Sequence, residues 1–281
     1  AYGGPSGISV GTAVSISGAA ANPNMGFHSS PTLAFLMTLF NARLGAWLGN
    51  PGKEGEKTYT KAGPKQAIRP LLSELFGMST DKSPYVSLSD GGHFENLGIY
   101  EMVLRRCRFL VVCDAASDPK VAFEDLGNAI RKVRIDFGVP IEFERKVQIL
   151  PRDERGVGTY CATAAIRYSV VDNTDPERDG FLIYVKPSLA AGLRPDPLDV
   201  YSYARASQTF PHETTADQWF SESQFESYRA LGRFLISLVS PEDSPFATLD
   251  DFKAAVEGYI DSREKGGDGG KVIQMPERES A

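Results

Sequence analysis

The stretch YVSLSDGGHFENLGIYEMVLRRCRFLVVCD, residues 85–114, decides the fold prediction. Residues 85–89 are typical of a short strand, and they run into a turn made of an aspartate and two glycines. Residues 95–107 follow as a predicted helix, and residues 108–113 carry the continuous apolar run of a buried parallel strand. Residues 122–137 form the clearest helix, because their large apolar side chains recur at spacings of three and four. Strand, helix, strand and helix in this order predict an α/β fold with an open, mainly parallel sheet flanked by helices.

The rest of the chain is assigned around this core by hydrophobic periodicity and turn residues. Further strands are predicted at 142–150, 160–171 and 181–185, and further helices at 31–48, 70–76, 216–239 and 249–260. The small and β-branched residues at 12–17 favour an extended segment. Residues 50–65 lack a period and are expected to form a surface loop, and residues 263–281 are expected to be a disordered tail.

Composition excludes several classes of function. The 281 residues carry a net charge of −6, which argues against a nucleic-acid-binding protein with its basic face. The sequence contains no apolar run of about 18 residues, so no membrane span is predicted. The three cysteines form no Cys-x-x-Cys pair, and the histidines show no metal-ligand spacing, so we expect neither a metal site nor a cofactor.

Asp90 is the leading candidate for chemistry. It follows a predicted strand, and ligands bind beyond the carboxyl ends of strands in open α/β sheets. The glycines at 91 and 92 tolerate positive φ and allow another backbone or a substrate to come close. From the residues alone, an aspartate in this place can be a base, a metal ligand or a turn former.

A family resemblance favours the first of these roles. Residues 89–101, SDGGHFENLGIYE, followed by 105–114, RRCRFLVVCD, resemble the aspartate motif of bacterial patatin-like phospholipases, relatives of plant patatin and of cytosolic phospholipase A. Residues 16–26, 125–138, 210–213 and 224–228 also resemble blocks of that family. The similarity covers about 2–238, so that residues 1–262 are expected to be the C-terminal part of the family's catalytic domain.

The resemblance implies a lipid acyl ester hydrolase with a Ser–Asp dyad. Asp90 would be the base that accepts the proton of a serine, with no histidine between them. Candidates to line the site are Gly91, Gly92, His93, Ser17 and Gly18. The resemblance also implies a phospholipid or related substrate, peripheral contact with a membrane, and a place in the cytoplasm or on the cytoplasmic face of a membrane.

The sequence departs from the family pattern at the nucleophile. The family's serine lies in Gly-x-Ser-x-Gly between a strand and a helix. Only residues 7–11, GISVG, match these letters, and an extended segment rather than a helix is expected after Ser9. We therefore expect neither Ser9 nor Ser6 to be the nucleophile, and we expect the serine to precede residue 1 in a longer protein. The sheet is then incomplete on its N-terminal side and exposes an unpaired edge.

Two alternatives remain open. One is a non-catalytic lipid- or partner-binding module that retains the fold without the chemistry, since the chain lacks a well-placed serine. In a minor alternative, Ser9 or Ser6 serves as nucleophile and the chain is active alone.

Overall fold

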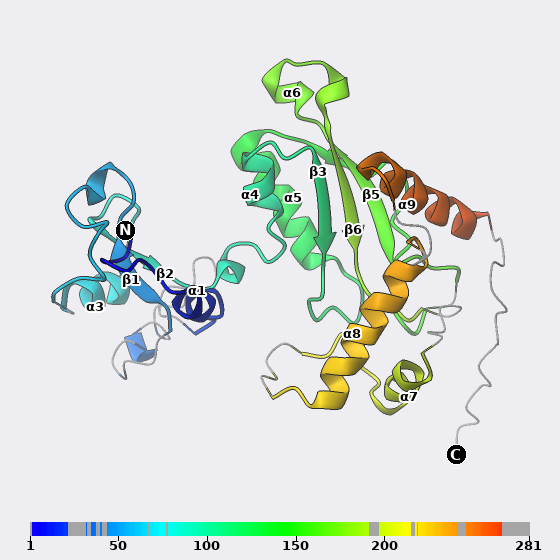
Figure 1. The fold of residues 1–281 in the computed structure, drawn as a ribbon, viewed down its shortest axis with the longest axis horizontal. Helices are drawn as coiled ribbons and strands as arrows, with labels where there is room; N and C mark the ends of the chain where they lie inside the picture. The colour runs from blue at the N-terminus through cyan, green and yellow to red at the C-terminus, as the bar shows by residue number, and fades with distance from the viewer. Residues whose placement is uncertain are drawn as a thin grey trace. The chain divides into compact units, whose positions relative to one another are not determined.

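The computed structural model describes residues 2–21, 32, 35–37, 40, 44–66, 68–76, 78–154, 156–190, 197–214, 217, 219–240 and 246–265. The chain divides into two compact units, Ala1–Asn96 and Leu97–Ala281. Each unit has its own sheet, and each is described by itself (Figure 1).

The first unit is built around a two-stranded antiparallel sheet. Strands β1 and β2 pair with Ala46 opposite Leu88 and Gly49 opposite Tyr85. The described elements are α1 (Val10–Ser17), β1 (Ala46–Gly49), η2 (Lys53–Gly55), α3 (Ile68–Leu75), β2 (Tyr85–Leu88) and η3 (Gly91–His93). Strand β2 leads through Ser89 into the turn at Asp90.

The second unit holds a four-stranded mixed sheet in the order β3-β6-β5-β4. Strands β3 and β6 are parallel, whereas β5 is antiparallel to both of its neighbours. The elements are α4 (Ile99–Leu104), β3 (Phe109–Cys113), α5 (Glu124–Phe137), β4 (Ile141–Glu142), β5 (Cys161–Ile166), α6 (Ser169–Asp172), η4 (Pro176–Arg178), β6 (Gly180–Val185), α7 (Leu198–Ala206), α8 (Glu222–Ser237) and α9 (Leu249–Glu264).

Helices cover both faces of this sheet (Figure 1). Strand β6 has apolar side chains on both faces, which the helices bury. Leu182 and Tyr184 belong to the core shared with α4 and α5, whereas Ile183 belongs to the core shared with α7, α8 and α9. All three side chains are fully buried. Burial of such an aliphatic side chain contributes about 1.5–3 kcal/mol, so the two cores on either side of β6 hold the unit together.

Local signals set the helix ends. Ser221 caps α8 by accepting a hydrogen bond from the Gln224 N–H, and Thr248 and Asp251 form a capping box at the start of α9. Helix α5 ends at Gly138, whose φ of 68° lies in the left-handed region. These caps explain why the helices expected near 122–137 and 249–260 form close to their predicted bounds.

Several expectations are wrong. Residues 46–49 form strand β1, not the end of a helix at 31–48; of that predicted helix, residues 32 and 35–37 are helical, and residues 31, 33–34, 38–39 and 41–43 lie outside the described part. Residues 12–17 belong to helix α1 rather than to an extended segment. The strands expected at 142–150 and 160–171 shrink to β4 and β5, which end at Glu142 and Ile166.

Three helix ends also differ from prediction. Helix α4 starts only at Ile99, after Gly98 in the left-handed region, and α8 starts at Glu222 rather than at 216. Helix α9 continues to Glu264, so the first residues of the tail expected from 263 are helical, and residues 266–281 lie outside the described part.

The sheet is mixed, not mainly parallel. The segment between β5 and β6, residues 167–179, contains only the short elements α6 and η4. A parallel connection needs a crossover of a dozen or more residues that packs across the sheet, usually as a helix. Without such a helix the chain returns alongside itself, and β5 and β6 pair antiparallel.

Candidate functional site

Asp90 lies in a tight turn that leaves β2. Its backbone has φ −57° and ψ 127°, and its Oδ1 accepts a hydrogen bond from the Gly92 N–H at 2.8 Å. The His93 N–H donates to the Asp90 carbonyl at 3.3 Å, and the Phe94 N–H donates to the Gly91 carbonyl at 2.9 Å. The side chain of Asp90 thereby caps η3, and its carboxylate has a fixed direction.

The second carboxylate oxygen of Asp90 is open. Among the described residues, no hydrogen bond or ion pair reaches its Oδ2, and the residue as a whole is half-buried. A general base needs a positioned, ionised carboxylate with a lone pair facing the proton donor. The turn supplies the fixed position and the free lone pair, since Oδ1 holds the group in place while Oδ2 is available.

The two glycines of the turn differ in the space that surrounds them. A Cβ at Gly92 would lie 2.4 Å from the Asn96 Oδ1 and 3.2 Å from the Asp90 Oδ1, whereas one at Gly91 would meet nothing within 4 Å. Neither glycine has a positive φ. A side chain at Gly92 would therefore meet the side chains of Asn96 and Asp90, whereas Gly91 has open space, and neither position uses the positive φ that glycine tolerates.

His93 completes η3 beside the carboxylate. Its side chain is half-buried, and its Nε2 is enclosed without a hydrogen-bond partner among the described residues. An enclosed polar atom without a partner is uncommon in a folded protein. The histidine therefore presents an unused nitrogen in the same turn as the open oxygen of Asp90.

The segment predicted to line the site does meet the Asp90 turn. The Asp90 N–H donates to the carbonyl of Ala19 at 3.5 Å, and Ala19 is fully buried. Ser17 ends helix α1, and Gly18 caps it with an N–H directed at the Val14 carbonyl. The fold of the first unit thus places Ser17 and Gly18 one or two residues from the contact with Asp90.

The serine of the GISVG segment has a structural role. Ser9 caps α1, because its Oγ accepts the Thr12 N–H at 3.0 Å and lies 2.9 Å from the Thr12 Oγ1. A helix does follow this serine, contrary to expectation, but residues 2–9 contain turns and no strand. Ser6 is exposed in one of these turns. The strand–turn–helix context of a nucleophile is therefore only half present at Ser9.

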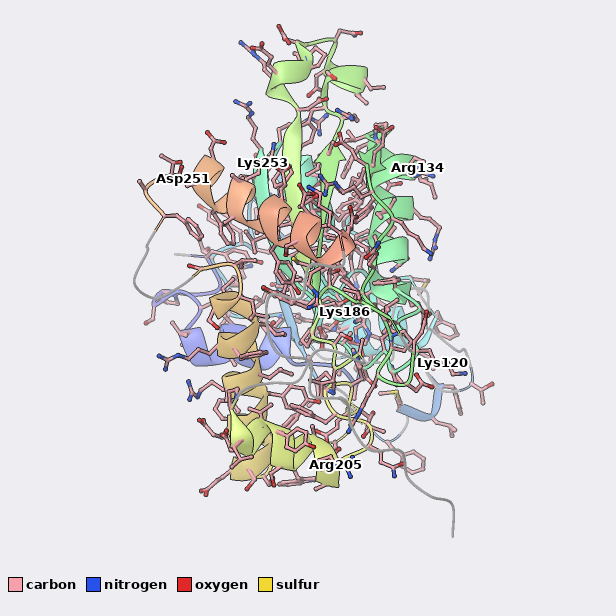
Figure 2. All side chains as sticks on the ribbon, turned by 90° about the vertical axis from the view of Figure 1, so that its right-hand side faces the viewer. Lys120, Arg134, Lys186, Arg205, Asp251 and Lys253 are labelled. Atoms are coloured by element: carbon pink, nitrogen blue, oxygen red, sulfur yellow. The ribbon has the colours of Figure 1, made fainter. Side chains whose placement is uncertain are left out.

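Sequence reasoning did not bring together a second group of charged residues, which lies in the second unit. Asp114 follows β3 and Lys186 follows β6, and the parallel pairing of these strands brings the Lys186 Nζ to 3.1 Å from the Asp114 Oδ2. The Tyr184 hydroxyl donates to the same oxygen, and the Asp114 Oδ1 accepts the Ala116 N–H at 2.9 Å. Both charged side chains are 1% exposed, and Figure 2 shows Lys186 inside the unit.

His212 lies at the border of this charged group. Burial, followed by the nearby charge of Lys186, lowers the pKa of His212 below its ordinary value of 6.5. Its Nδ1 is buried without a hydrogen-bond partner among the described residues. Asp114, Lys186 and His212 are far apart in the chain, so their spacing in the sequence does not group them.

The three arginines at 105, 106 and 108 do not form a free basic patch. Arg106 binds both carboxylate oxygens of Asp172, at 2.8 and 3.0 Å. Arg105 pairs with Glu101, and Arg108 donates to the Glu177 carbonyl at 2.6 Å. All three guanidinium groups are bound within the second unit.

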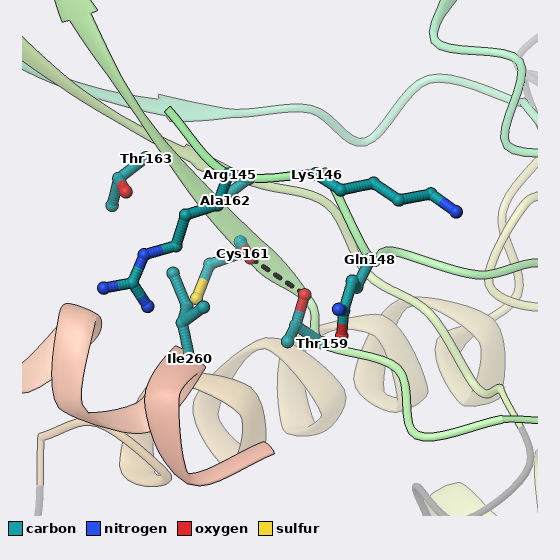
Figure 3. Close-up of a pocket in the computed structure, with 8 residues that line it drawn as sticks. All are labelled: Arg145, Lys146, Gln148, Thr159, Cys161, Ala162, Thr163 and Ile260. Atoms are coloured by element: carbon teal, nitrogen blue, oxygen red, sulfur yellow. Dashed lines mark hydrogen bonds between the residues drawn. The ribbon is translucent and has the colours of Figure 1, made fainter. Parts of the chain in front are cut away.

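A small pocket lies between β5 and α9 (Figure 3). Cys161 lines it, and burial raises the pKa of this thiol to about 12. The Thr159 Oγ1 donates to the Cys161 carbonyl at 2.9 Å, and Arg145 pairs with Asp261 nearby. Because the thiolate is the reactive form of cysteine, this pocket has no activated nucleophile.

Comparisons with known proteins do not identify the chain. No family model matches it, and no curated protein or solved structure is significantly similar to it. Among the described residues, no three His, Cys, Asp or Glu side chains are grouped so that they could hold a metal. None of the helices in the described part has the length and apolar character needed to cross a membrane.

Proposed function

We propose that this chain contributes the base of a lipid acyl ester hydrolase, with Asp90 as the aspartate of a Ser–Asp dyad. The observation that carries the proposal is the asymmetric use of the Asp90 carboxylate. Its Oδ1 is held by the Gly92 N–H, while its Oδ2 has no partner among the described residues. The resemblance of residues 89–114 to the patatin-like motif supports the same role.

The proposed reaction follows from ordinary acyl transfer. The serine hydroxyl gives its proton to the Asp90 Oδ2 while its oxygen attacks the ester carbonyl. Collapse of the tetrahedral intermediate releases the alcohol, which takes the proton back from Asp90, and leaves an acyl-serine. Water gives a proton to the same carboxylate as its oxygen attacks the acyl-serine, and Asp90 returns that proton to the serine oxygen as the fatty acid leaves. In this proposal the serine is supplied by sequence outside residues 1–281, and the substrate is a phospholipid or related lipid ester.

The surroundings of Asp90 suit a base that acts without histidine. Asp90 is half-buried, and the capping bond to Gly92 leaves its second oxygen accessible. A cytoplasmic location and peripheral contact with a membrane belong to the same proposal.

The test is ester hydrolysis by the protein expressed from the complete reading frame, with a p-nitrophenyl ester and with phosphatidylcholine vesicles as substrates. Asp90→Asn is expected to lower turnover by about 10²–10⁴-fold, the usual contribution of a general base. Asp175→Asn is the matched control, because Asp175 caps η4 in the same way, with φ −60° and a bond from the Glu177 N–H at 2.9 Å.

The control variant is expected to keep turnover within about twofold, since an asparagine caps as well as an aspartate. Undiminished turnover in Asp90→Asn would refute the proposed role. Vesicle binding without any ester turnover in the unmodified protein would instead favour the non-catalytic lipid-binding module.

A further inference from the structure

Segment 207–213 lies between helices α7 and α8 in the chain and contacts the loop that follows β3. The Ser117 hydroxyl donates to the His212 carbonyl at 3.0 Å, and the His212 side chain hydrogen-bonds the backbone of Ala116. His212 is 5% exposed, so its imidazole is enclosed within the second unit. This histidine therefore joins the segment to the carboxyl end of β3.

The same segment has a second set of anchors, on the side of α7 and α8. The Arg152 guanidinium donates to three carbonyls of the segment at 2.8 to 3.2 Å. The Glu213 carboxylate accepts hydrogen bonds from the Ser207 hydroxyl and the Gln224 amide, and the Glu213 N–H donates to the Tyr228 hydroxyl. An arginine keeps its charge at every pH near neutrality. Imidazole is the side chain whose ordinary pKa falls between pH 5 and 8, so acidification acts on the β3 side of the segment.

Charged groups from two elements face the imidazole of His212. Lys186 follows β6, and Asp114 and Asp118 lie in the loop that follows β3. Burial opposes a positive charge on His212 most strongly, and the Lys186 ammonium opposes it as well. The bond to Ala116 and the two carboxylates favour that charge, but the balance still lowers the pKa of His212.

The hydrogen bonds of the imidazole suit its neutral form. Nδ1 is buried and has no partner among the described residues, so the bond to Ala116 is made by Nε2. In a neutral ring one nitrogen donates and the other carries a lone pair. Protonation would add an N–H at Nδ1 without an acceptor in the described part of the chain, and a buried donor of this kind destabilises the structure that holds it.

We propose that His212 is a pH-sensitive switch that controls the contact between segment 207–213 and the loop after β3. The neutral side chain closes this contact. The protonated side chain opens it and admits water to the buried pair of Asp114 and Lys186. The anchors on the side of α7 and α8 remain, so the opening is local. The change of charge is at His212, and the element with two positions is the segment that carries it.

The titration of an exposed histidine bounds the size of the effect. In the open form the imidazole is in water and takes up a proton with its ordinary pKa of 6.5. The contact is therefore stable above pH 6.5 and weakens as the pH falls below it. Between pH 7.5 and 5.5 the opening constant is expected to rise by about three- to tenfold, where tenfold corresponds to a closed form that takes up no proton.

The test is hydrogen–deuterium exchange at pH 7.5 and 5.5, corrected for the intrinsic pH dependence of amide exchange, in the protein expressed from the complete reading frame. The amides of Ala116 and His212 report the contact, since they donate to the Asp114 carboxylate and the Thr209 carbonyl. Their protection is expected to fall about three- to tenfold at pH 5.5. Their exchange is also expected to be insensitive to low urea, as is typical of local opening, whereas exchange in β5 rises with urea.

Two variants separate the charge from the contact. His212→Gln keeps an amide donor but cannot gain a proton in this range, and it is expected to reduce the pH effect to less than about twofold. Ser117→Ala removes a neutral hydrogen bond of the same segment, and it is expected to lower protection equally at both pH values. His93→Gln is the control, because His93 lies in the first unit, and it is expected to keep the full pH effect.

Circular dichroism confirms that each variant is folded. Equal protection of Ala116 and His212 at the two pH values in the unmodified protein overturns the proposal. A pH effect that survives His212→Gln also overturns it. The same holds if the two amides show the protection and the urea dependence of β5, because the contact then opens only when the whole unit unfolds.

Discussion

Asp90 and Asp114 both follow strands of a sheet and begin the same kind of turn. Asp90 comes after β2 and accepts the Gly92 N–H at 2.8 Å, and Asp114 comes after β3 and accepts the Ala116 N–H at 2.9 Å. In each turn, one carboxylate oxygen accepts a hydrogen bond from the backbone N–H two residues further along the chain. At this local level the two aspartates are equivalent.

They differ in the use of the second oxygen. The Oδ2 of Asp114 binds both the Lys186 ammonium and the Tyr184 hydroxyl, and the residue is 2% exposed. The Oδ2 of Asp90 has no partner among the described residues, and the residue is half-buried. A carboxylate with both oxygens occupied serves structure, whereas one with an oriented, open oxygen can accept a proton.

The largest expected effect comes from breaking the buried pair. Lys186→Met is expected to lower the free energy of unfolding by about 3–5 kcal/mol, because it leaves the Asp114 carboxylate buried without its counter-charge. Lys120→Met serves as the control, since Lys120 is exposed, and is expected to change stability by less than about 0.5 kcal/mol. Urea denaturation followed by circular dichroism measures both.

A double variant sharpens this test. Asp114→Asn together with Lys186→Met removes both charges, and it is expected to recover part of the loss seen in Lys186→Met alone. If Lys186→Met is as stable as the unmodified protein, Asp114 is not held by this pair and the comparison with Asp90 fails.

An intermediate effect is expected in the Asp90 turn. Gly92→Ala is expected to cost about 1–3 kcal/mol, because its Cβ would come within 2.4 Å of the Asn96 Oδ1. Gly91→Ala has open space and is the matched control, with little change expected. The Asp114 turn already carries an alanine at the corresponding position, Ala116. Equal stability of the two glycine variants would show that close packing does not shape the Asp90 turn.

The smallest effect is a dependence on pH near the buried pair. The pKa of His212 lies below 6.5 in the folded protein, so the unfolded chain takes up the proton first as the pH falls. The stability that neutral His212 contributes is present above pH 6.5 and is lost below it, at no more than about 1.4 kcal/mol per pH unit. His212→Gln is expected to flatten the decline between pH 6.5 and 5.5 in urea titrations. An unchanged slope would contradict this role.

The sequence predicted the parts of the fold that depend on local signals. The strand ending at Leu88, strand β3 and helix α5 follow from residue type and periodicity, and the turn at Asp90 follows from its glycines. Helix α1 was missed because the cap at Ser9 outweighs the β-branched residues after it. Strand β1 was missed because its pairing partner lies about 40 residues away in the chain.

In the candidate site, too, the features set by local sequence could be predicted and those set by long-range pairing could not. The turn at Asp90 and Gly92, and the nearness of the segment at Gly18 to Asp90, were within reach of sequence reasoning. The pairing of Asp114 with Lys186 was not, because it depends on β3 and β6 being neighbours although some 70 residues separate them. Lys186 directly after a buried strand is the only signal that sequence offers.

The most direct test of the account measures ester turnover and stability together for Asp90→Asn and Asp114→Asn, in the protein expressed from the complete reading frame. The account predicts that Asp90→Asn keeps its unfolding free energy within about 1 kcal/mol but loses at least about a hundredfold in turnover. It predicts that Asp114→Asn is destabilised but keeps its turnover per folded molecule. Full turnover in Asp90→Asn, or a turnover defect confined to Asp114→Asn, would contradict it.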